Sequence, residues 1–304
     1  MIELIKGTNI DFMGLRKIAF AFSGALILLC VFALVQIYRG QGNLGIDLAG
    51  GTSLQLKFKT PVDLEKARTV LGSAGLAHAG LQWVEGENIL LVKVAAKGKE
   101  EKMVAAAVVT ALKKGIPENQ PSVESVAEIG PAVGQKLRSD ALLAMLVSAI
   151  AIIGYLAYRF EFKFGVGAAI ATFHDIAAMT GIFFLLGREM DLLFITALLT
   201  IGGYSLTDTV VVFDRIRENM RLRKKGNFYD TINHSVNEVL SRTIVTSLTV
   251  FFTCLALLFF GGVVLKDFAL ALSIGVVIGT YSSIFVASPV VAFLKGERKV
   301  EVKG

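Results

Sequence analysis

Six long apolar segments constrain this chain more than any other feature of its sequence. A helix needs about 20 mostly apolar residues to cross a hydrocarbon core of about 30 Å. The composition agrees, since 54% of the residues are hydrophobic and the mean hydropathy is +0.65. The sequence therefore predicts an α-helical membrane protein with six transmembrane helices, at residues 18–38, 139–158, 164–186, 191–213, 243–265 and 268–294.

Two of these segments need comment. The fifth and sixth are separated only by Lys266 and Asp267, but together they are too long for one crossing, which predicts a helical hairpin. The first is too long for the apolar region of a signal peptide, and no small-x-small cleavage pattern follows it before Arg39. We expect it to remain as an anchor.

Lys and Arg residues flank the segments asymmetrically. They gather before the first segment, around the loop 159–163, through residues 214–242 and after the sixth segment, whereas the opposite short loops hold only Arg188 and Lys266. The positive-inside rule then places residues 1–17, 214–242 and 295–304 in the cytoplasm and translocates residues 39–138. The net charge of +6 follows from this topology, so we expect no nucleic-acid partner.

The pattern of the translocated residues 39–138 predicts a separate α+β domain. A strand is predicted at 53–59, a helix after Pro61 with Thr60 as its N-cap, two strands around a turn at 85–87, a helix at 100–114 and a strand at 122–129. This order is that of the ferredoxin-like fold. The domain shows no clustered His, Cys or acidic residues, so we expect a binding or lever domain and no enzyme activity.

Three ionisable residues lie inside the predicted spans: His174 and Asp175 in the third and Asp208 in the fourth. A charged side chain at the centre of a span costs about 2.5–3.5 kcal/mol on insertion scales. Two interpretations stay open. Each residue either hydrogen-bonds a neighbouring helix and fixes the packing, or forms part of a proton pathway.

The surroundings of Asp208 favour a protonatable site. Tyr204 and Ser205 lie one turn before it, and Thr207 and Thr209 flank it. Such hydroxyl groups can hold water beside a carboxyl group. A desolvated carboxyl favours its neutral form and a nearby cation favours its charged form, so small rearrangements can load or release a proton.

Arg242, at the entrance of the fifth span, is the cation that we expect near Asp208. Asp208 lies about 9 Å of helix rise from the cytoplasmic end of its span, within reach if the fourth and fifth spans adjoin. The alternative is that Arg242 is an ordinary cytoplasmic anchor. The sequence contains no glycine-rich phosphate loop, and Cys30 and Cys254 lie in apolar spans, so we expect no nucleotide site, metal or cofactor.

Small and apolar residues add two further expectations. Gly202 and Gly203 precede Asp208, and Gly275 and Gly279 form a GxxxG pattern, so close helix contacts are expected there. Apolar residues at helical spacing in the segment 228–240 predict an amphipathic helix. It either lies at the membrane surface or packs on the membrane domain.

Three stretches together resemble the SecF family, whose members pair with SecD in bacterial protein export. They are GIDLAGGTSLQL at 45–56, FHD at 173–175, and GREMDLLFITALLTIGGYSLTDTVVVFDRIREN at 187–219. The resemblance covers essentially the whole chain. Thr207 departs from it, because the family usually has Asn before the acid.

The resemblance implies half of a resistance-nodulation-division type unit, with SecD supplying the other half. It implies use of the proton motive force in late steps of export, with proton passage through Asp208 and Arg242, and it includes His174 and Asp175 as a further motif. The other motif positions are Gly45, Asp47, Gly50 and Gly51 in the translocated domain, Gly202, Gly203, Tyr204, Ser205, Thr207 and Thr209 in the fourth span, and Asp214 and Arg215 just after it.

The same resemblance implies a location and partners. We expect a multi-pass protein of the bacterial cytoplasmic (inner) membrane, in contact with the lipid bilayer, with both termini cytoplasmic. The expected partners are SecD, the channel subunits SecY, SecE and SecG, YajC as a further candidate, and the exported unfolded polypeptide. Two other functions stay open: a proton-coupled exporter of small molecules or lipids, and a passive scaffold of the translocon.

Overall fold

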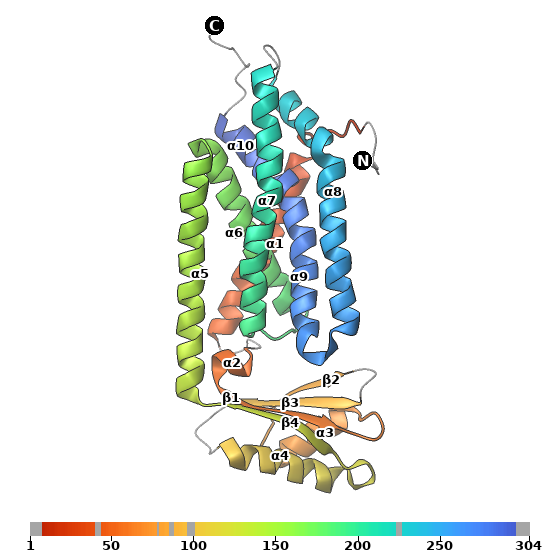
Figure 1. Ribbon diagram of the computed structural model, residues 1–304. Helices are drawn as coiled ribbons and strands as arrows, with labels where there is room; N and C mark the ends of the chain where they lie inside the picture. Colours follow the sequence, from red (N-terminus) through yellow and green to blue (C-terminus); the bar gives the residue numbers. More distant parts are fainter. Residues whose placement is uncertain are drawn as a thin grey trace. The chain divides into compact units, whose positions relative to one another are not determined.

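The computed structural model describes residues 8–39, 44–77, 79–84, 88–95, 101–222 and 227–295. The chain forms two compact units (Figure 1). One comprises Met1–Asn43 with Met145–Gly304, and the other comprises Leu44–Ala144.

The first unit is a bundle of long helices, and the prediction of six spans is confirmed, because the described residues contain six helices long and apolar enough to cross a membrane. The sixth continues through a π-helical turn, η2, into α10. The elements are α1 (Arg16–Tyr38), α5 (Pro131–Arg159), α6 (Phe162–Leu185), α7 (Leu192–Leu222), α8 (Phe228–Phe260), α9 (Gly262–Ser282), η2 (Ser283–Ala287) and α10 (Ser288–Lys295).

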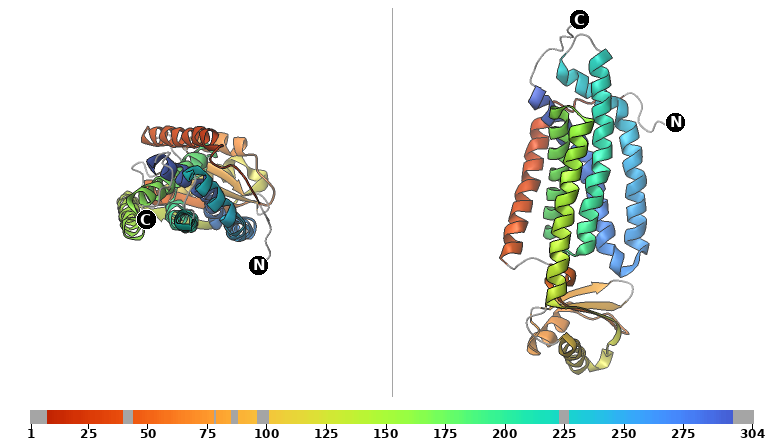
Figure 2. Two further views of the ribbon diagram at one scale, coloured as in Figure 1. Left: turned by 90° about the horizontal axis from the view of Figure 1, so that it is seen from above. Right: turned by 60° about the vertical axis from the view of Figure 1, so that its left-hand side comes forward.

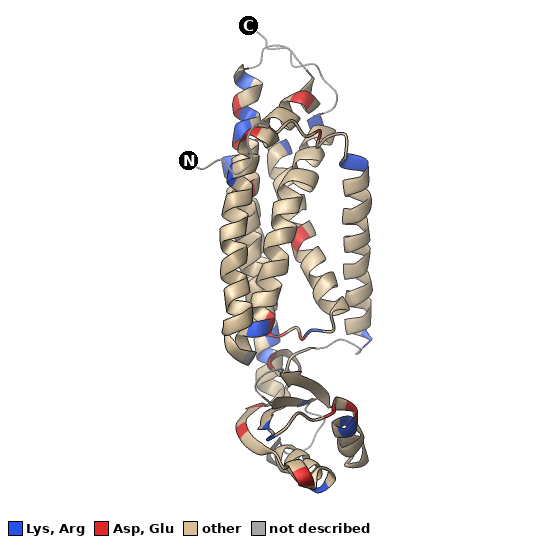
Figure 3. Cartoon of the chain, turned by 90° about the vertical axis from the view of Figure 1, so that its right-hand side faces the viewer, with Lys and Arg blue, Asp and Glu red and all other residues tan. Residues whose placement is uncertain are grey.

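Helices α6, α7 and α9 pack against one another and form the centre of this bundle. Helix α1 packs on α6, and α8 packs on both α7 and α9. Figure 2 shows α1 and α5 at the margins of the bundle. Charged residues gather toward the ends of the long helices, as the colours in Figure 3 show, and few lie in the middle of the bundle.

Glycines permit the closest helix contacts of the bundle. A Cβ atom on Gly279 of α9 would lie 2.9 Å from the Cβ of Ser205 on α7, and one on Gly275 would lie 2.5 Å from Cγ1 of Ile201. A Cβ on Gly181 of α6 would lie 2.8 Å from the backbone nitrogen of Cys30 on α1. The expected GxxxG contact therefore joins α9 to α7.

The hairpin between the last two spans turns earlier than Lys266 and Asp267. Helix α8 ends at Phe260 and α9 begins at Gly262, which takes φ +73°. Glycine adopts this left-handed conformation without the steric cost that a side chain imposes, and this explains the position of the turn.

The amphipathic segment 228–240 is the first part of α8, continuous with the fifth span. Its apolar residues Phe228, Ile232, Val236 and Leu240 are buried in the main core of the bundle, together with residues of α7 and α10. Of the two interpretations, the structure supports a helix packed on the membrane domain.

Two asparagines of α8 hold the segment before α1. Asn237 accepts from the backbone N–H of Ile10 and donates to its carbonyl, and Asn233 accepts from the N–H of Met13. The N–H of Gly14 and the side chain of Asn233 both donate to Asp11, which lowers the pKa of this exposed carboxyl. The start of α1 is thus fixed to the start of α8.

The second unit has the predicted ferredoxin-like order. Its four strands form an antiparallel sheet in the order β2-β3-β1-β4. Leu54, Leu56, Leu90 and Val92 alternate on the two central strands and form the core with two helices. The elements are β1 (Gly51–Lys57), α3 (Leu64–Ser73), β2 (Gly80–Val84), β3 (Ile89–Ala95), α4 (Glu101–Gly115) and β4 (Ser122–Ile129).

One detail of this unit differs from the sequence prediction, and another concerns residues that the structure does not describe. Asp63, and not Thr60, is the N-cap of α3, because its carboxylate accepts from the N–H of Glu65. The predicted turn at 85–87 lies outside the described residues.

The glycine motif lies at the start of this sheet. Gly45 precedes the short helix α2 (Ile46–Ala49), which contains Asp47, and Gly51 begins β1. Gly50 takes φ +74°, and a Cβ there would lie 3.1 Å from Cα of Pro131. A Cβ on Gly134 would lie 2.8 Å from the nitrogen of Gly50, so both glycines allow α2 and the start of α5 to touch.

The close contact at Gly279 gives a direct test. We expect Gly279→Ala to destabilise the bundle by about 1–3 kcal/mol, because the added methyl group overpacks α9 against Ser205. Gly24→Ala on α1 is the matched control, since a Cβ there meets nothing within 4 Å and the change gains up to about 1 kcal/mol of helix propensity. The free energy of unfolding in mild detergent measures both, and equal effects would contradict the account.

Candidate functional site

Asp208 is buried on α7, with 6% of its surface exposed. Its Oδ2 accepts one hydrogen bond, from Oγ of Ser247 on α8, at the long distance of 3.4 Å. That same Oγ accepts from Thr280 of α9 at 2.7 Å and from the hydroxyl of Tyr204 at 3.3 Å. The carboxyl group therefore lies at the end of a hydroxyl chain that joins three helices, and it is weakly held.

Asp175 of α6 is buried more completely and held more firmly. None of its surface is exposed. Its Oδ2 accepts from Ser205 of α7 at 2.5 Å and from Ser282 of α9 at 2.9 Å, and its Oδ1 lies 3.1 Å from Nδ1 of His174. These contacts use both carboxylate oxygens and join α6, α7 and α9.

His174 lies beside Asp175 on the same helix, 3% exposed. Its ring lies 6.2 Å from the ring of Tyr281. With Nδ1 facing Asp175, Nε2 is one of two buried side-chain polar atoms that lack a hydrogen-bond partner among the described residues; the other is the hydroxyl of Thr243.

Four consecutive residues of α9 and η2 connect these groups. Thr280 donates to Ser247, Tyr281 donates to the carbonyl of Ala19 on α1, and Ser282 donates to Asp175. Ser283 lies 2.9 Å from Oγ1 of Thr209 on α7. We call the segment 280–283 the hydroxyl hub, because it contacts α1, α6, α7 and α8.

The hydroxyl hub ends in the π-helical turn η2. Pro289 follows in α10 and has no N–H to donate to the carbonyl four residues earlier, which disrupts the regular helical ladder. The hydroxyl of Ser288 donates to the carbonyl of Ser283, five residues back. π-Helical turns occur frequently at functional sites, since they change which residues face a neighbouring helix.

The two buried acids differ in the hydrogen-bond partners that they have among the described residues. Asp175 has three polar partners, which use both of its carboxyl oxygens, so its geometry supports a packing role. Within the part of the chain that the structure describes, Asp208 has one hydrogen bond, and it is long, so its carboxyl oxygens keep unused bonding capacity.

Arg242 lies at an exposed position of α8 and has no ion pair among the described residues. It precedes Ser247 by five residues, which corresponds to about 7.5 Å of rise and about 140° of rotation. Asp208 thus faces Ser247, and Arg242 lies on a different face of α8.

The remaining motif residues of α7 fall on three surfaces. Gly202 is buried near Thr172, while Gly203 and Thr207 are exposed, and the hydroxyl of Thr207 donates to the carbonyl of Tyr204 in its own helix. Asp214 accepts from Arg159 of α5 at 2.6 Å, and Arg215 forms a paired contact with Glu238 of α8 at 2.7 and 2.8 Å. The two charged residues tie neighbouring helices together.

The sequence analysis missed the hydroxyl residues that bond to the acids or belong to the hydroxyl hub. These are Ser247, Thr280, Ser282 and Ser283, and their common signal is a hydroxyl within a span. Among the described residues, no three His, Cys, Asp or Glu side chains come together in a way that would hold a metal.

Comparisons with known proteins agree with the motif resemblance. A family model for "Protein export membrane protein SecD/SecF, C-terminal" matches residues 108–297, and one for the "SecD/SecF GG Motif" matches residues 43–62. The first match covers more than half of the chain. The chain belongs to the SecD/SecF family.

Relatives within this family have nearly the same length. The protein translocase subunit SecF of Thermodesulfovibrio yellowstonii is 51% identical over 97% of both chains. That of Calditerrivibrio nitroreducens is 41% identical over 98% of both. The crystal structure of SecDF from Thermus thermophilus, whose title calls it translocon-associated, aligns with a TM-score of 0.80 and 38% identity, over 95% of this chain. This chain spans only 39% of that SecDF chain.

The hydrogen bonds to Asp175 give a second prediction. We expect Ser282→Ala to lower the free energy of unfolding by about 1 kcal/mol, because it removes a donor between α9 and α6. Ser273→Ala on the same helix is the control, since its buried hydroxyl donates only to the carbonyl of Ala269 in its own helix. Reversible unfolding in detergent micelles measures both variants. If Ser273→Ala proves the more damaging, the bond to Asp175 does not stabilise the bundle.

Proposed function

We propose that this chain is the SecF-type subunit of a SecD–SecF unit in the bacterial cytoplasmic membrane. It uses the proton motive force to promote late steps of protein export. It acts as a transport subunit rather than as an enzyme, and needs no cofactor. The family membership and the SecF relatives support the assignment, and the geometry of Asp208 supports the mechanism.

The single observation that carries the mechanism is the weak attachment of Asp208. A carboxyl group buried in a span, with one hydrogen bond of 3.4 Å, is costly when charged and little constrained when neutral. Protonation removes the charge and turns one oxygen into a donor, which changes the preferred partner of Ser247. Ser247 also accepts a hydrogen bond from Thr280. In the proposal, protonation of Asp208 therefore changes the hydrogen bonding of the hydroxyl hub.

In this proposal, Arg242 acts when Asp208 releases its proton. Arg242 has no ion pair with any residue that the structure describes, and it lies about one and a half turns from Ser247. Both features suit a side chain that approaches Asp208 after α8 rotates. Its approach stabilises the charged carboxylate and favours proton release. His174 and Asp175 link the proton site to α6 and transmit the change.

The energy available from one proton is sufficient for such a switch. A charge crossing the membrane yields about 2.3 kcal/mol per 100 mV. Since about 1.36 kcal/mol corresponds to a factor of ten, one proton biases a two-state equilibrium roughly fifty-fold. In the proposal, this bias moves the helices and, through them, the translocated domain that contacts the exported chain.

Pairing with SecD is supported by the exposed face of α7. Thr196, Thr200, Gly203 and Thr207 share this face at helical spacing, and all four are exposed. Small and hydroxyl residues on a span are typical of helix–helix contacts in membranes. Because this chain spans 39% of the SecDF chain, we propose that a SecD helix covers this face.

The orientation and the remaining partners follow from the same proposal. The described ends of the spans that carry most Lys and Arg, including Arg16, Arg159 and Lys295, lie in the cytoplasm by the positive-inside rule. The unit Leu44–Ala144 is then periplasmic. SecY, SecE, SecG, YajC and the emerging unfolded polypeptide are its proposed partners in export.

The decisive variant for the mechanism is Asp208→Asn. It keeps the size and polarity of the side chain but cannot exchange a proton, so we expect loss of the export stimulated by the proton motive force, with assembly intact. The measurement is the translocation of a secreted protein into inverted vesicles, or its release from cells, with and without an ionophore. Asp267→Asn, which breaks a half-buried pair with Arg188, is the control and should export normally. Full proton-dependent export by Asp208→Asn would favour a passive scaffold.

The proposed interface with SecD is tested by Gly203→Leu. A Cβ at Gly203 meets no atom within 4 Å among the described residues, and the leucine enlarges the exposed face of α7. We therefore expect at least about fivefold less SecD to co-purify, since overpacking costs about 1–3 kcal/mol. Gly154→Leu is the control, because Gly154 of α5 is likewise exposed and free of close neighbours. Undiminished SecD with Gly203→Leu would place the interface elsewhere.

A further inference from the structure

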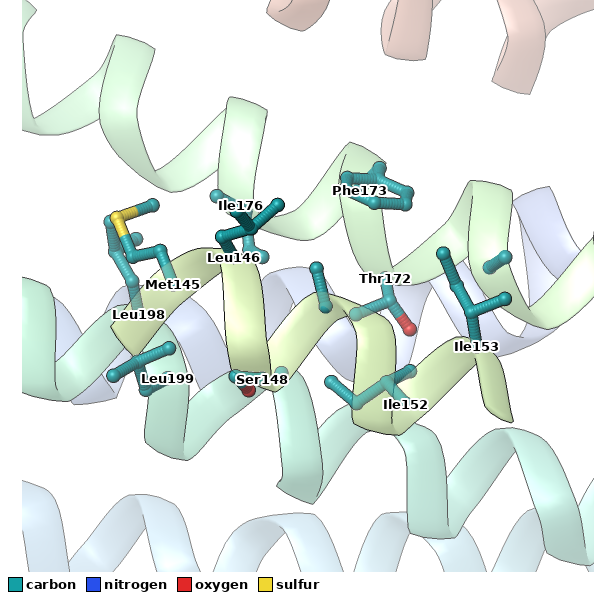
Figure 4. Close-up of a pocket in the computed structure, with 13 residues that line it drawn as sticks. Met145, Leu146, Ser148, Ile152, Ile153, Thr172, Phe173, Ile176, Leu198 and Leu199 are labelled. Atoms are coloured by element: carbon teal, nitrogen blue, oxygen red, sulfur yellow. The ribbon is translucent and has the colours of Figure 1, made fainter. Parts of the chain in front are cut away.

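A cavity of about 290 Å³ lies between α5, α6 and α7. Figure 4 shows its walls: Ile152 and Ser148 from α5, Thr172 from α6 and Leu198 from α7 point into one space. Ser148 and Thr172 carry its polar side-chain atoms, and the other lining residues are apolar or glycine. The cavity belongs entirely to the helical unit and lies within the membrane-spanning segments.

A space of this size and chemistry is suited to an apolar ligand. An engineered cavity of about 150 Å³ lined by apolar side chains stays free of water and binds benzene, and this one is about twice as large. Leu146, Ile153 and Phe173 line it and are also exposed, at 57%, 47% and 51%. The cavity therefore opens to the hydrocarbon that surrounds the spans, where acyl chains are the abundant apolar groups.

Basic residues gather about two turns from the cavity, at the junction of α5 and α6. Lys163 lies about 9 Å of helix rise before the lining residue Ala169, and Arg159 lies a similar distance after Ile153. Lys163 is exposed and shares a face of α6 with Ile170, seven residues on. The exposed rings of Tyr158 and Phe162 flank the two basic residues, as is typical at the membrane–water interface.

The charge of this junction is positive. Arg159 and Arg217 both lie over the ring of Phe160 and share one acid, Asp214. Lys295 lies within electrostatic reach of Arg217, Lys163 and Glu161. The groups at the junction are thus four basic residues, Arg159, Lys163, Arg217 and Lys295, and two acidic ones, Glu161 and Asp214. An anionic headgroup complements this excess of two positive charges.

We infer that the cavity is a binding site for one acyl chain of an anionic phospholipid, whose phosphate is held at Lys163 and the neighbouring basic residues. The acyl chain runs along α6 past Ile170 and enters beside Phe173. It fills the space between α5 and the centre of the bundle. At Gly202 and Thr172 it reaches within one turn of Ser205 and Asp175, so the lipid also supports the polar contacts between α6 and α7.

The test uses a fluorescent reporter at the mouth of the cavity. Trp83 is the single tryptophan of the sequence, so Trp83→Phe with Phe173→Trp places the signal there. The full chain, alone and with SecD, is reconstituted in phosphatidylcholine vesicles that contain a minor fraction of phosphatidylglycerol. Bromine is placed on the acyl chains of one lipid or the other. Leu28→Trp on α1, a lipid-facing position that is 70% exposed, is the control reporter.

In the Phe173→Trp variant we expect brominated phosphatidylglycerol to quench the tryptophan fluorescence about fivefold more strongly per molecule than brominated phosphatidylcholine. This is the preference expected for one basic contact. At Leu28→Trp we expect equal quenching. Adding Lys163→Gln should remove the preference and Lys163→Arg should keep it. Adding Ala149→Phe, which fills the cavity, should reduce quenching at Phe173→Trp without changing the control reporter.

Three results would overturn the inference. Equal quenching by the two lipids at Phe173→Trp would show ordinary lipid contact. A preference that survives Lys163→Gln would place the headgroup elsewhere. Quenching that disappears when SecD is bound would show that a protein helix, and not a lipid, covers the cavity.

Discussion

The bundle depends on how it satisfies two carboxyl groups that lie where water is scarce. Asp175 receives hydrogen bonds from α7 and α9 and faces the ring of its neighbour His174, so it joins three helices at one point. Asp208 lies one turn beyond Ser205 on α7 but has only a long bond from α8. Because unpaired polar groups are costly inside a membrane, the helices must approach closely enough for these hydroxyls to reach. Gly279 permits that approach, since any side chain there would collide with Ser205.

The hydroxyl hub makes the two acids parts of one system. Thr280 is bonded to the partner of Asp208, and Ser282 is bonded to Asp175, two residues along the same helix. The hub ends in the π-helical turn η2, which Pro289 requires. A π-helical turn that moves or relaxes rotates the residues before it relative to their neighbours. Hydrogen bonds through the hub therefore connect the surroundings of Asp208 with α6 and α1.

Much of the fold follows from the sequence, but the partners of the acids do not. Length and apolar composition define the six spans, and alternation in Leu54 and Leu56 defines the central strand of the second unit. The acids could be predicted as candidate site residues because a charged residue inside a span is unusual. The hydroxyls that bind them were not, because a hydroxyl in a span can equally satisfy itself on its own helix, as Thr200 and Thr253 do. The rotation of α8, which turns Ser247 rather than Arg242 toward Asp208, depends on packing against α7 and α9 and has no signature in the spacing.

The central claim is that Asp208 exchanges a proton while Asp175 serves as a fixed connection. Infrared difference spectroscopy of the reconstituted protein with SecD, recorded as the pH is changed, measures this most directly through the C=O stretch of protonated carboxyl groups. The account predicts a band that appears as the pH falls, that Asp208→Asn removes and that Asp267→Asn leaves unchanged. A band that persists in Asp208→Asn and disappears in Asp175→Asn would contradict it, and would make Asp175 the proton carrier.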